Sequence, residues 1–297
     1  MKIKLGSRAQ ALAGAATVVL AAVALPLAAQ DRLRVLVVND DGIGATGLQA
    51  LVTELAIVAD VVVCAPDKDR SWAGRSKTIP SGMLRLREAK IAGATEAYAI
   101  EGTPVDAVRF GLGALGAETP FDAVIAGVNF GVTLGAEAYS TGVVGAALEA
   151  ASMGVPAIAV AQDRRAHVFD VAGSVTRQLI ENWLEVGLAE GVALSVNIPA
   201  SAADRPRGIV AARLGDSEYA ISGFRKVERD DAGSEARRQM WRIQFKKVRR
   251  PERETDLDWY QRGEIIVTPL NANGSATDLV GQIDGWGLQT PTRAPSE

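Results

Sequence analysis

The sequence predicts an α/β protein built on a doubly wound, mostly parallel sheet, with a C-terminal β-hairpin or extension. Short segments that are almost wholly apolar alternate with segments in which apolar residues recur every three or four positions. The first pattern is typical of strands buried on both faces, and the second of helices that pack on one side. Strands that alternate with helices form parallel βαβ units, which assemble into a sheet of this kind.

The predicted elements alternate between strand and helix along most of the chain. Buried strands are expected at residues 33–38, 60–64, 97–100, 123–126, 156–160, 194–196 and 265–267, with a shorter one at 84–86. Helices are expected at residues 46–57, 103–115, 142–153 and 168–188. In the first helix Leu48, Leu51 and Leu55 fall on one side. The second begins at Thr103-Pro104, because proline is favoured in the first turn of a helix.

The first residues have the pattern of a targeting segment. Lys2, Lys4 and Arg8 form a basic start, residues 11–24 are almost wholly apolar, and residues 28–30 supply small side chains for cleavage. We therefore expect residues 1–29 to be a signal peptide that is removed on export, which in a bacterium means the periplasm. The alternative is a single membrane anchor, but the apolar segment is short for a membrane span. After cleavage no membrane contact is expected.

The remaining chain divides into a core at residues 30–200 and a C-terminal extension at residues 201–297. Residues 205–254 are charged and strand-like, and within them residues 241–245 alternate in the manner of a half-exposed strand. This pattern predicts an arm or hairpin, and exposed hairpins often form contacts between subunits. The apolar strand at 265–267 is expected to return to the core.

Charge and rare residues exclude several classes of function. The formal net charge is −3, and removing residues 1–29 takes away three positive charges and no negative ones, which leaves −6. An acidic chain is a poor binder of nucleic-acid polymers, which attract basic patches. The only cysteine is Cys64, so no internal disulfide can form. The only histidine is His167, which excludes multi-histidine zinc sites and argues against a histidine-based hydrolase.

Polar side chains follow three of the predicted strands. Asp40 and Asp41 come directly after the first strand, Ser71 lies in the loop after the second, and Asn129 follows the strand at 123–126. The carboxyl ends of parallel strands meet at one edge of a sheet, where ligands bind. Two carboxylates, a hydroxyl and an amide oxygen there form an oxygen-only set that suits Mg²⁺ or Mn²⁺. The alternative is a solvated turn in which Asp41 caps the next helix.

Two other motif matches lie in the same loops. Residues 42–47 fit G-x-G-x-x-G, with Asp67 about 20 residues further on, which resembles a dinucleotide-binding fingerprint. Asp40 and Asp41 would then sit beside an anionic pyrophosphate, which argues against this interpretation. Residues 64–71 fit the C-x-x-x-x-x-R-S pattern of cysteine-dependent phosphatases, but Asp67 and Asp69 oppose both phosphate binding and a reactive thiolate. Cys64 is better explained as a small buried apolar residue.

Several stretches together resemble the SurE survival-protein family, metal-dependent phosphatases that act on nucleoside monophosphates. The main ones are V-V-N-D-D-G-I-G-A-T-G (37–47), V-V-V-C-A-P-D-K-D-R-S (61–71), E-G-T-P-V-D-A-V (101–108) and A-G-V-N-F-G-V-T-L-G (126–135). Shorter similarities lie at N-I-P (197–199), T-D (255–256) and V-T-P-L (267–270). The resemblance implies a Rossmann-like, metal-binding core, hydrolysis of nucleoside 5′-monophosphates with one divalent ion, and an extension exchanged within homodimers or homotetramers.

The resemblance also implies roles for individual residues. Asp40, Asp41, Ser71 and Asn129 fall on the family's metal-ligand positions. We expect Asp40 and Asp41 to be catalytic as well, because either could orient or deprotonate the attacking water. The residues expected to contact the substrate are Asn39, Thr133, Ser140, Thr141 and Gly142.

Two departures from the family pattern leave a second function open. Thr133 stands where the family usually has an asparagine, and Thr141-Gly142-Val143 stands where it has Ser-Gly-Thr. A helix that begins there still presents backbone N–H groups to a phosphate. The alternative is an exported protein that binds phosphorylated ligands through the metal with little turnover. An NAD-dependent oxidoreductase is a further alternative, from the G-x-G-x-x-G match.

Overall fold

The computed structural model describes residues 32–78, 82–166, 169–201, 207–227, 239–275, 277–279 and 282. Its strands are β1 (Leu33–Val38), β2 (Ala59–Pro66), β3 (Leu86–Glu88), β4 (Ala94–Ile100), β5 (Ala123–Phe130), β6 (Ala157–Gln162), β7 (Val192–Ile198), β8 (Ile209–Ala211), β9 (Tyr219–Val227), β10 (Met240–Lys247) and β11 (Ile265–Asn271). Its helices are α1 (Thr46–Leu55), α2 (Pro104–Phe110), α3 (Gly142–Ser152), α4 (Asp170–Val186) and α6 (Asp256–Arg262). Shorter helical segments are η2 (Gly111–Leu115), η3 (Gly135–Ser140) and η4 (Thr277–Leu279).

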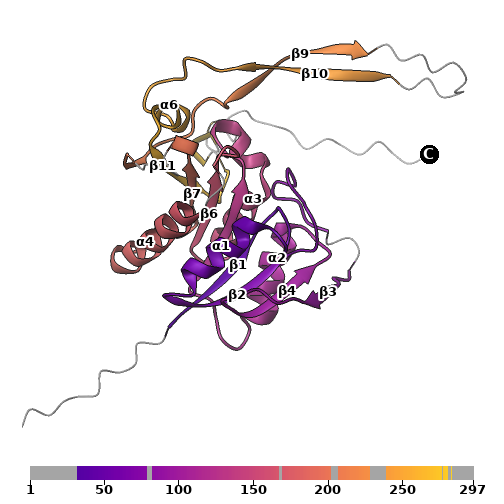
Figure 1. Ribbon diagram of the computed structural model, residues 1–297, viewed down its shortest axis with the longest axis vertical. Coiled ribbons are helices and arrows are strands. Elements are labelled where there is room, and N and C mark those ends of the chain that lie inside the picture. Colours follow the sequence, from indigo (N-terminus) through magenta and orange to yellow (C-terminus); the bar gives the residue numbers. More distant parts are fainter. Residues whose placement is uncertain are drawn as a thin grey trace, which may run out of the picture. The chain divides into compact units, whose positions relative to one another are not determined.

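The described strands form a nine-stranded sheet in the order β3-β4-β2-β1-β5-β6-β7-β11-β8, and β9 pairs with β10 separately (Figure 1). Neighbours in the larger sheet are parallel, except that β3 runs antiparallel to β4 and β11 to β7. The chain proceeds outward from β1 through β2 and β4 and then returns to β5 on the other side of β1. The predicted doubly wound sheet is confirmed, and its switch point lies between β1 and β5.

Helices cover both faces of the sheet. This is required because successive apolar side chains of β1 point to opposite faces, and both faces must be shielded from water. Val35 and Val37 belong to an apolar cluster that includes side chains of α1 and α4. Leu36 and Val38 point to the other face and pack with residues of α2 and α3. All four are fully buried. No helix among the residues that the structure describes is long and apolar enough to cross a bilayer.

The structure differs from the sequence-based elements in several places, three of which have an evident cause. β5 continues to Phe130, four residues beyond the predicted strand, because Asn129 and Phe130 still pair with β6. β3 lies at residues 86–88 rather than 84–86, where it pairs antiparallel with β4. Helix α6 was not predicted, since its seven residues are too few to show a clear apolar repeat.

The side chain of Glu149, on α3, is completely buried and meets three cations. Its carboxylate lies 2.7 Å from Arg75 Nε, 3.0 Å from Lys77 Nζ and 2.5 Å from Arg109 Nε. Burial alone would raise the pKa of Glu149, but hydrogen bonds from these three side chains hold it below its usual value. Glu149 therefore joins α3 to α2 and to the loop that follows β2.

We expect Glu149→Gln to lower the free energy of unfolding by about 2 kcal/mol, because three cations lose their shared partner. The loss is smaller than for a wholly buried pair, since the cations keep part of their hydration. Urea unfolding at pH 7 measures it. Glu101→Gln is the matched control, because Glu101 pairs with Arg85 at an exposed site, where the expected change is below about 0.5 kcal/mol. Equal stabilities of the two variants would contradict the assignment.

Candidate active site

A tight turn after β1 carries the two predicted carboxylates. The Asn39 amide donates to the Gly42 carbonyl at 2.8 Å, and its oxygen accepts from the Gly42 N–H at 3.2 Å. Gly42 has a φ of +97°, and a Cβ there would come within 3.0 Å of the Lys68 carbonyl carbon. Asn39 thus holds the turn that presents Asp40 and Asp41. Its expected contact with substrate stays a prediction.

Asp40 is 1% exposed and faces the start of α3. Its Oδ2 accepts a hydrogen bond from Gly142 N at 3.0 Å. A Cβ at Gly142 would lie 2.6 Å from Asp40 Cβ, so only glycine allows this approach. Asp40 Oδ1 is buried without a partner among the described residues. Burial, and then the charge of Asp41, raise the pKa of Asp40 to about 7.

Asp41 connects the same turn to the end of β5. Its Oδ2 accepts from Phe130 N at 3.0 Å, which places Asp41 beside the residue that follows Asn129. The Asn129 amide donates to the Gly131 carbonyl at 2.5 Å, and its side-chain oxygen accepts no hydrogen bond from the residues that the structure describes. Burial raises the pKa of Asp41, while the Phe130 N–H and the Arg164 charge oppose that rise.

The loop after β2 joins the group through its backbone. Arg70 N donates to the Asp40 carbonyl at 2.7 Å, so Ser71 lies next to the β1 turn. Hydrogen bonds from Ser71, first from its hydroxyl and then from its N–H, lower the pKa of Asp69. The charge of Asp69 in turn raises the pKa of Asp41. The structure therefore brings the loops of Asp40-Asp41, Ser71 and Asn129 together at the switch point.

These residues fit a hard divalent cation. Asp40 and Asp41 are adjacent carboxylates with raised pKa values, and the Arg164 charge opposes that rise only at Asp41. Asp40, which has an unpartnered buried oxygen among the described residues, therefore calls for a further positive charge. An ion bound by Asp40, Asp41, Ser71 and Asn129 would supply that charge through oxygen ligands. Within the described ranges, no group of three or more His, Cys, Asp and Glu residues is placed to bind a metal. A site here accordingly depends on the hydroxyl and the amide.

The expected substrate-contacting residues lie in different surroundings. Thr133 is buried, and its N–H and hydroxyl contact Asn197 Oδ1 at 2.6 and 3.2 Å, so it faces β7. The Thr141 hydroxyl donates to the Ala138 carbonyl at 3.1 Å, and the Gly142 N–H is taken by Asp40. Ser140 is exposed. His167 lies outside the described residues.

The structure explains by packing why Cys64 and the glycines of the G-x-G-x-x-G segment stand where they do. Cys64 is buried inside β2, and burial raises the pKa of its thiol to about 12. A reactive phosphatase cysteine needs the opposite shift. In the G-x-G-x-x-G segment, a Cβ at Gly47 would lie 2.6 Å from the Val128 carbonyl oxygen. Gly47 therefore lets α1 pack closely against β5.

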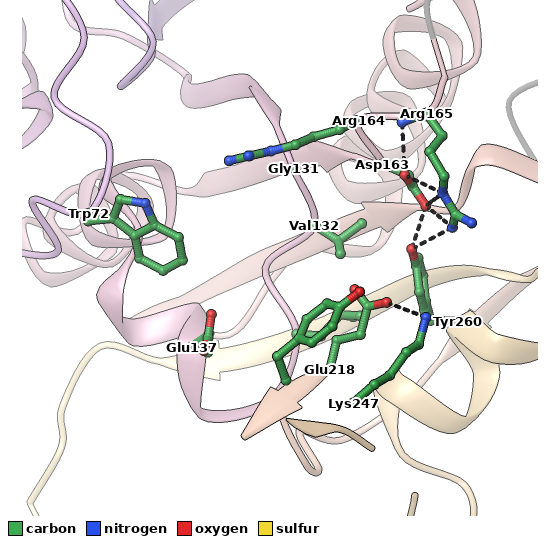
Figure 2. Close-up of a pocket in the computed structure, with 12 residues that line it drawn as sticks. Trp72, Gly131, Val132, Glu137, Asp163, Arg164, Arg165, Glu218, Lys247 and Tyr260 are labelled. Carbon is green, nitrogen blue, oxygen red and sulfur yellow. Dashed lines mark hydrogen bonds and ion pairs between the residues drawn. The ribbon is translucent and has the colours of Figure 1, made fainter. Parts of the chain in front are cut away.

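A pocket of about 390 Å³ opens beside these loops. Trp72 and Glu137 line one end, and Asp163, Arg165 and Tyr260 form a hydrogen-bonded group at the other (Figure 2). Trp72 is 61% exposed and has a φ of +66°. A bulky residue in the left-handed region is strained by about 1–3 kcal/mol, and such strain concentrates at functional sites.

Arg164 lines this pocket and was not among the residues predicted from the sequence. Its Nε donates to the Phe130 carbonyl at 2.9 Å, and its charge acts on both Asp41 and Asp69. Figure 2 shows its side chain passing Gly131 toward the Trp72 end. Arg164 comes two residues after β6. It therefore also fits the rule that selected Asp40 and Asn129, namely that polar residues at the carboxyl ends of parallel strands meet at one edge of the sheet.

The chain is similar to several SurE proteins. The 5′-nucleotidase SurE of Aliivibrio fischeri is 33% identical over 255 residues, 86% of this chain and 95% of the relative. The 5′-nucleotidase SurE 1 of Thermus thermophilus is 37% identical over 261 residues, 85% of this chain and 99% of the relative. The crystal structure of the SurE protein from Aquifex aeolicus superposes with a TM-score of 0.74 at 29% identity, and covers 85% of this chain and 98% of that one.

These relatives correct one expectation. The prediction of export to a periplasm is wrong, because the matching proteins are SurE 5′-nucleotidases, which are known as cytoplasmic enzymes. The expected leader lies outside the described residues. An apolar stretch of about 14 residues is typical of buried helices and interfacial segments as well as of signal peptides, so the pattern alone was not specific.

The family model for the survival protein SurE matches residues 35–221. That range contains the β1 turn, Ser71, Asn129 and the start of α3. With relatives of 33–37% identity along nearly their whole length, the chain belongs to the SurE family.

Proposed function

We propose that this chain is a divalent-metal-dependent phosphomonoesterase that releases phosphate from nucleoside 5′-monophosphates, with Mg²⁺ or Mn²⁺ as the ion. The observation that carries the proposal is the buried Asp40 beside the half-buried Asp41 at the switch point, with Asp40 Oδ1 unpartnered among the described residues. The names of the SurE relatives support the 5′-nucleotide as substrate.

In the proposed mechanism, water attacks the phosphorus directly, the bond from phosphorus to the nucleoside 5′-oxygen breaks, and the nucleoside leaves with a proton on that oxygen, which balances the proton that the water loses. The bound ion would offset the negative charge that grows on the phosphate oxygens. Asp40, Asp41, Ser71 and Asn129 would hold the ion, and one of the two carboxylates would orient the attacking water and accept its proton. We also assign a role to Arg164, which lines the adjoining pocket and donates to the Phe130 carbonyl: its guanidinium would pair with a phosphate oxygen as the charge develops.

A nucleotide panel tests the proposal. The EDTA-treated chain is incubated with nucleoside 5′- and 3′-monophosphates, with and without added Mn²⁺, and released phosphate is measured. We expect release from 5′-monophosphates that requires the added ion. Metal-dependent binding without release would instead support a protein that only holds phosphorylated ligands.

We also propose that β9 and β10 form the contact between subunits of a homodimer or homotetramer. Ile243 pairs directly with Phe224, and Phe245 with Ile221, across the two strands. Directly opposed residues share one face of a strand pair. That face carries the exposed apolar side chains Tyr219, Ile221, Phe224, Trp241, Ile243 and Phe245. Such a face in water favours burial against a second copy.

The double variant Phe224→Lys/Ile243→Lys is therefore expected to lower the solution mass to that of a monomer, because two charges would enter the apolar contact. Light scattering coupled to size exclusion measures the mass. Gln244→Lys is the control, since Gln244 lies on the opposite face of β10 and should leave the mass unchanged. An unchanged mass in the double variant would rule out this contact.

A further inference from the structure

We propose, on the basis of the function proposed above, that the pocket in Figure 2 holds the nucleobase of the substrate. Trp72 stacks on the face of the base, Glu137 accepts hydrogen bonds from its N–H edge, and the favoured base is guanine. Trp72 and Glu137 would thus determine specificity, whereas the oxygen donors act on the phosphate.

The pocket adjoins the phosphate end of the site through the chain itself. Trp72 directly follows Ser71, and Gly131 of the pocket wall accepts the Asn129 amide hydrogen bond at 2.5 Å. Arg164 lines the same pocket and also acts on Asp41. A ligand with its phosphate at Asp40 and Asp41 therefore has this pocket within reach of its sugar and base. The volume, about 390 Å³, lies in the range of small-molecule sites.

Trp72 has the features of a stacking platform. Its indole is 61% exposed although it is the largest kind of aromatic side chain, and its backbone is held at a φ of +66°. Packing does not explain an exposed ring on a strained backbone, whereas presentation to a ligand does. Stacking of a base on an aromatic ring is favourable for every base, because each base has a π-face.

Glu137 supplies the choice among bases. It lies on η3 at the Trp72 end of the pocket (Figure 2), and its carboxylate has no hydrogen-bond or ion-pair partner within the described part of the chain. A carboxylate has two acceptor oxygens and no donor. Guanine presents two adjacent donors, N1–H and the 2-amino group, which match both oxygens. Uracil presents one N–H between two carbonyl groups. The oxygens of these carbonyl groups carry partial negative charge and would be repelled by the carboxylate.

The experiment compares kcat/KM for guanosine, inosine and uridine 5′-monophosphates with Mn²⁺. Inosine differs from guanosine only by the missing 2-amino group, so guanosine monophosphate should be preferred over inosine monophosphate by about tenfold. Glu137→Gln should remove that preference, because an amide offers one acceptor instead of two. Trp72→Leu should lower kcat/KM about tenfold or more for all three substrates. Glu181→Gln, at an exposed position of α4, and Tyr139→Leu, an exposed aromatic outside the pocket, are the matched controls.

A second measurement is independent of turnover. Calorimetry with guanosine, which has no phosphate, in EDTA should detect binding to the unaltered chain and to Tyr139→Leu, and weaker binding to Trp72→Leu. Equal kcat/KM for the three nucleotides, or variants that match their controls in both measurements, would overturn the inference while leaving the phosphatase proposal intact. Guanosine binding that depends on Trp72, with no phosphate release from any nucleotide, would support the pocket and refute the phosphatase.

Discussion

Asp40→Asn is expected to lower Mn²⁺-dependent phosphate release by about a thousandfold. The substitution keeps the size of the side chain and leaves an oxygen that can accept from Gly142 N. It removes the negative charge of a buried ligand, and a catalytic ion contributes several kcal/mol of charge stabilisation. A loss of about 4 kcal/mol corresponds to a thousandfold in rate. Initial rates over a range of Mn²⁺ concentrations measure the effect and separate weaker ion binding from slower turnover.

Asp60→Asn is the control for that variant. Asp60 lies near the beginning of β2, at the opposite end of the strand from Ser71, and its exposed carboxylate pairs with Arg32 at 2.9 Å. The same chemical change there should leave phosphate release within about twofold, since an exposed ion pair contributes little. Undiminished activity in Asp40→Asn would refute the metal-ligand assignment.

The metal-free protein is expected to lose stability as the pH rises from about 4 to about 7. Burial and the Asp41 charge raise the pKa of Asp40 from 3.8 to about 7 in the folded chain. The folded state therefore keeps a proton that the unfolded state releases, so higher pH favours unfolding. The loss in the free energy of unfolding is complete above the folded pKa. It amounts to roughly 4 kcal/mol, because each unit of the rise in pKa from 3.8 to about 7 corresponds to 1.36 kcal/mol.

Asp40→Asn should remove most of this pH dependence, because asparagine does not titrate. Urea unfolding of both proteins in EDTA, at several pH values between 4 and 8, gives the two stability profiles. Other titrating groups are shared, so the difference between the profiles isolates Asp40. Parallel profiles would mean that the pKa of Asp40 is not raised. With Mn²⁺ added at pH 8, the unaltered chain should gain more stability than the variant, because the ion binds the folded state through Asp40.

The sequence predicted the doubly wound sheet because apolar periodicity is a local signal. Val35 to Val38 are buried on both faces in the structure, as their unbroken apolar pattern indicates. The sequence also allowed Asp40, Asp41, Ser71 and Asn129 to be grouped, since the carboxyl ends of parallel strands share one edge of the sheet. The order of the strands, which places β5 beside β1, comes from packing between distant segments and was not predicted.

Features that depend on backbone detail were missed. Trp72 follows Ser71 in the sequence, but nothing local indicates its φ of +66° or its place at one end of a pocket. For Thr133, which stays a predicted substrate residue, the sequence did not indicate that its N–H and hydroxyl contact Asn197 Oδ1. Which way a loop side chain turns is decided by the partners that folding brings near.

Helix α6 was missed although its ends carry recognisable signals. Asp256 and Asp258 lie in its first turn, Arg262 in its last, and Gly263 follows with a φ of +85°. Acidic starts, basic ends and a left-handed glycine are typical of helix termini. Asp256 also accepts from Gly135 N at 2.6 Å and from Gly215 N at 2.8 Å. Through these hydrogen bonds, helix α6 of the extension binds to the glycine-rich loop of the core.

The most direct test of the account is the position of the ion itself. Crystals of the chain soaked in MnCl₂ and measured at the manganese absorption edge give an anomalous peak at each bound ion. We predict one strong peak within about 2.0–2.5 Å of oxygens of Asp40, Asp41, Ser71 and Asn129. No peak at these four side chains, or one bound elsewhere on the chain, would contradict the account.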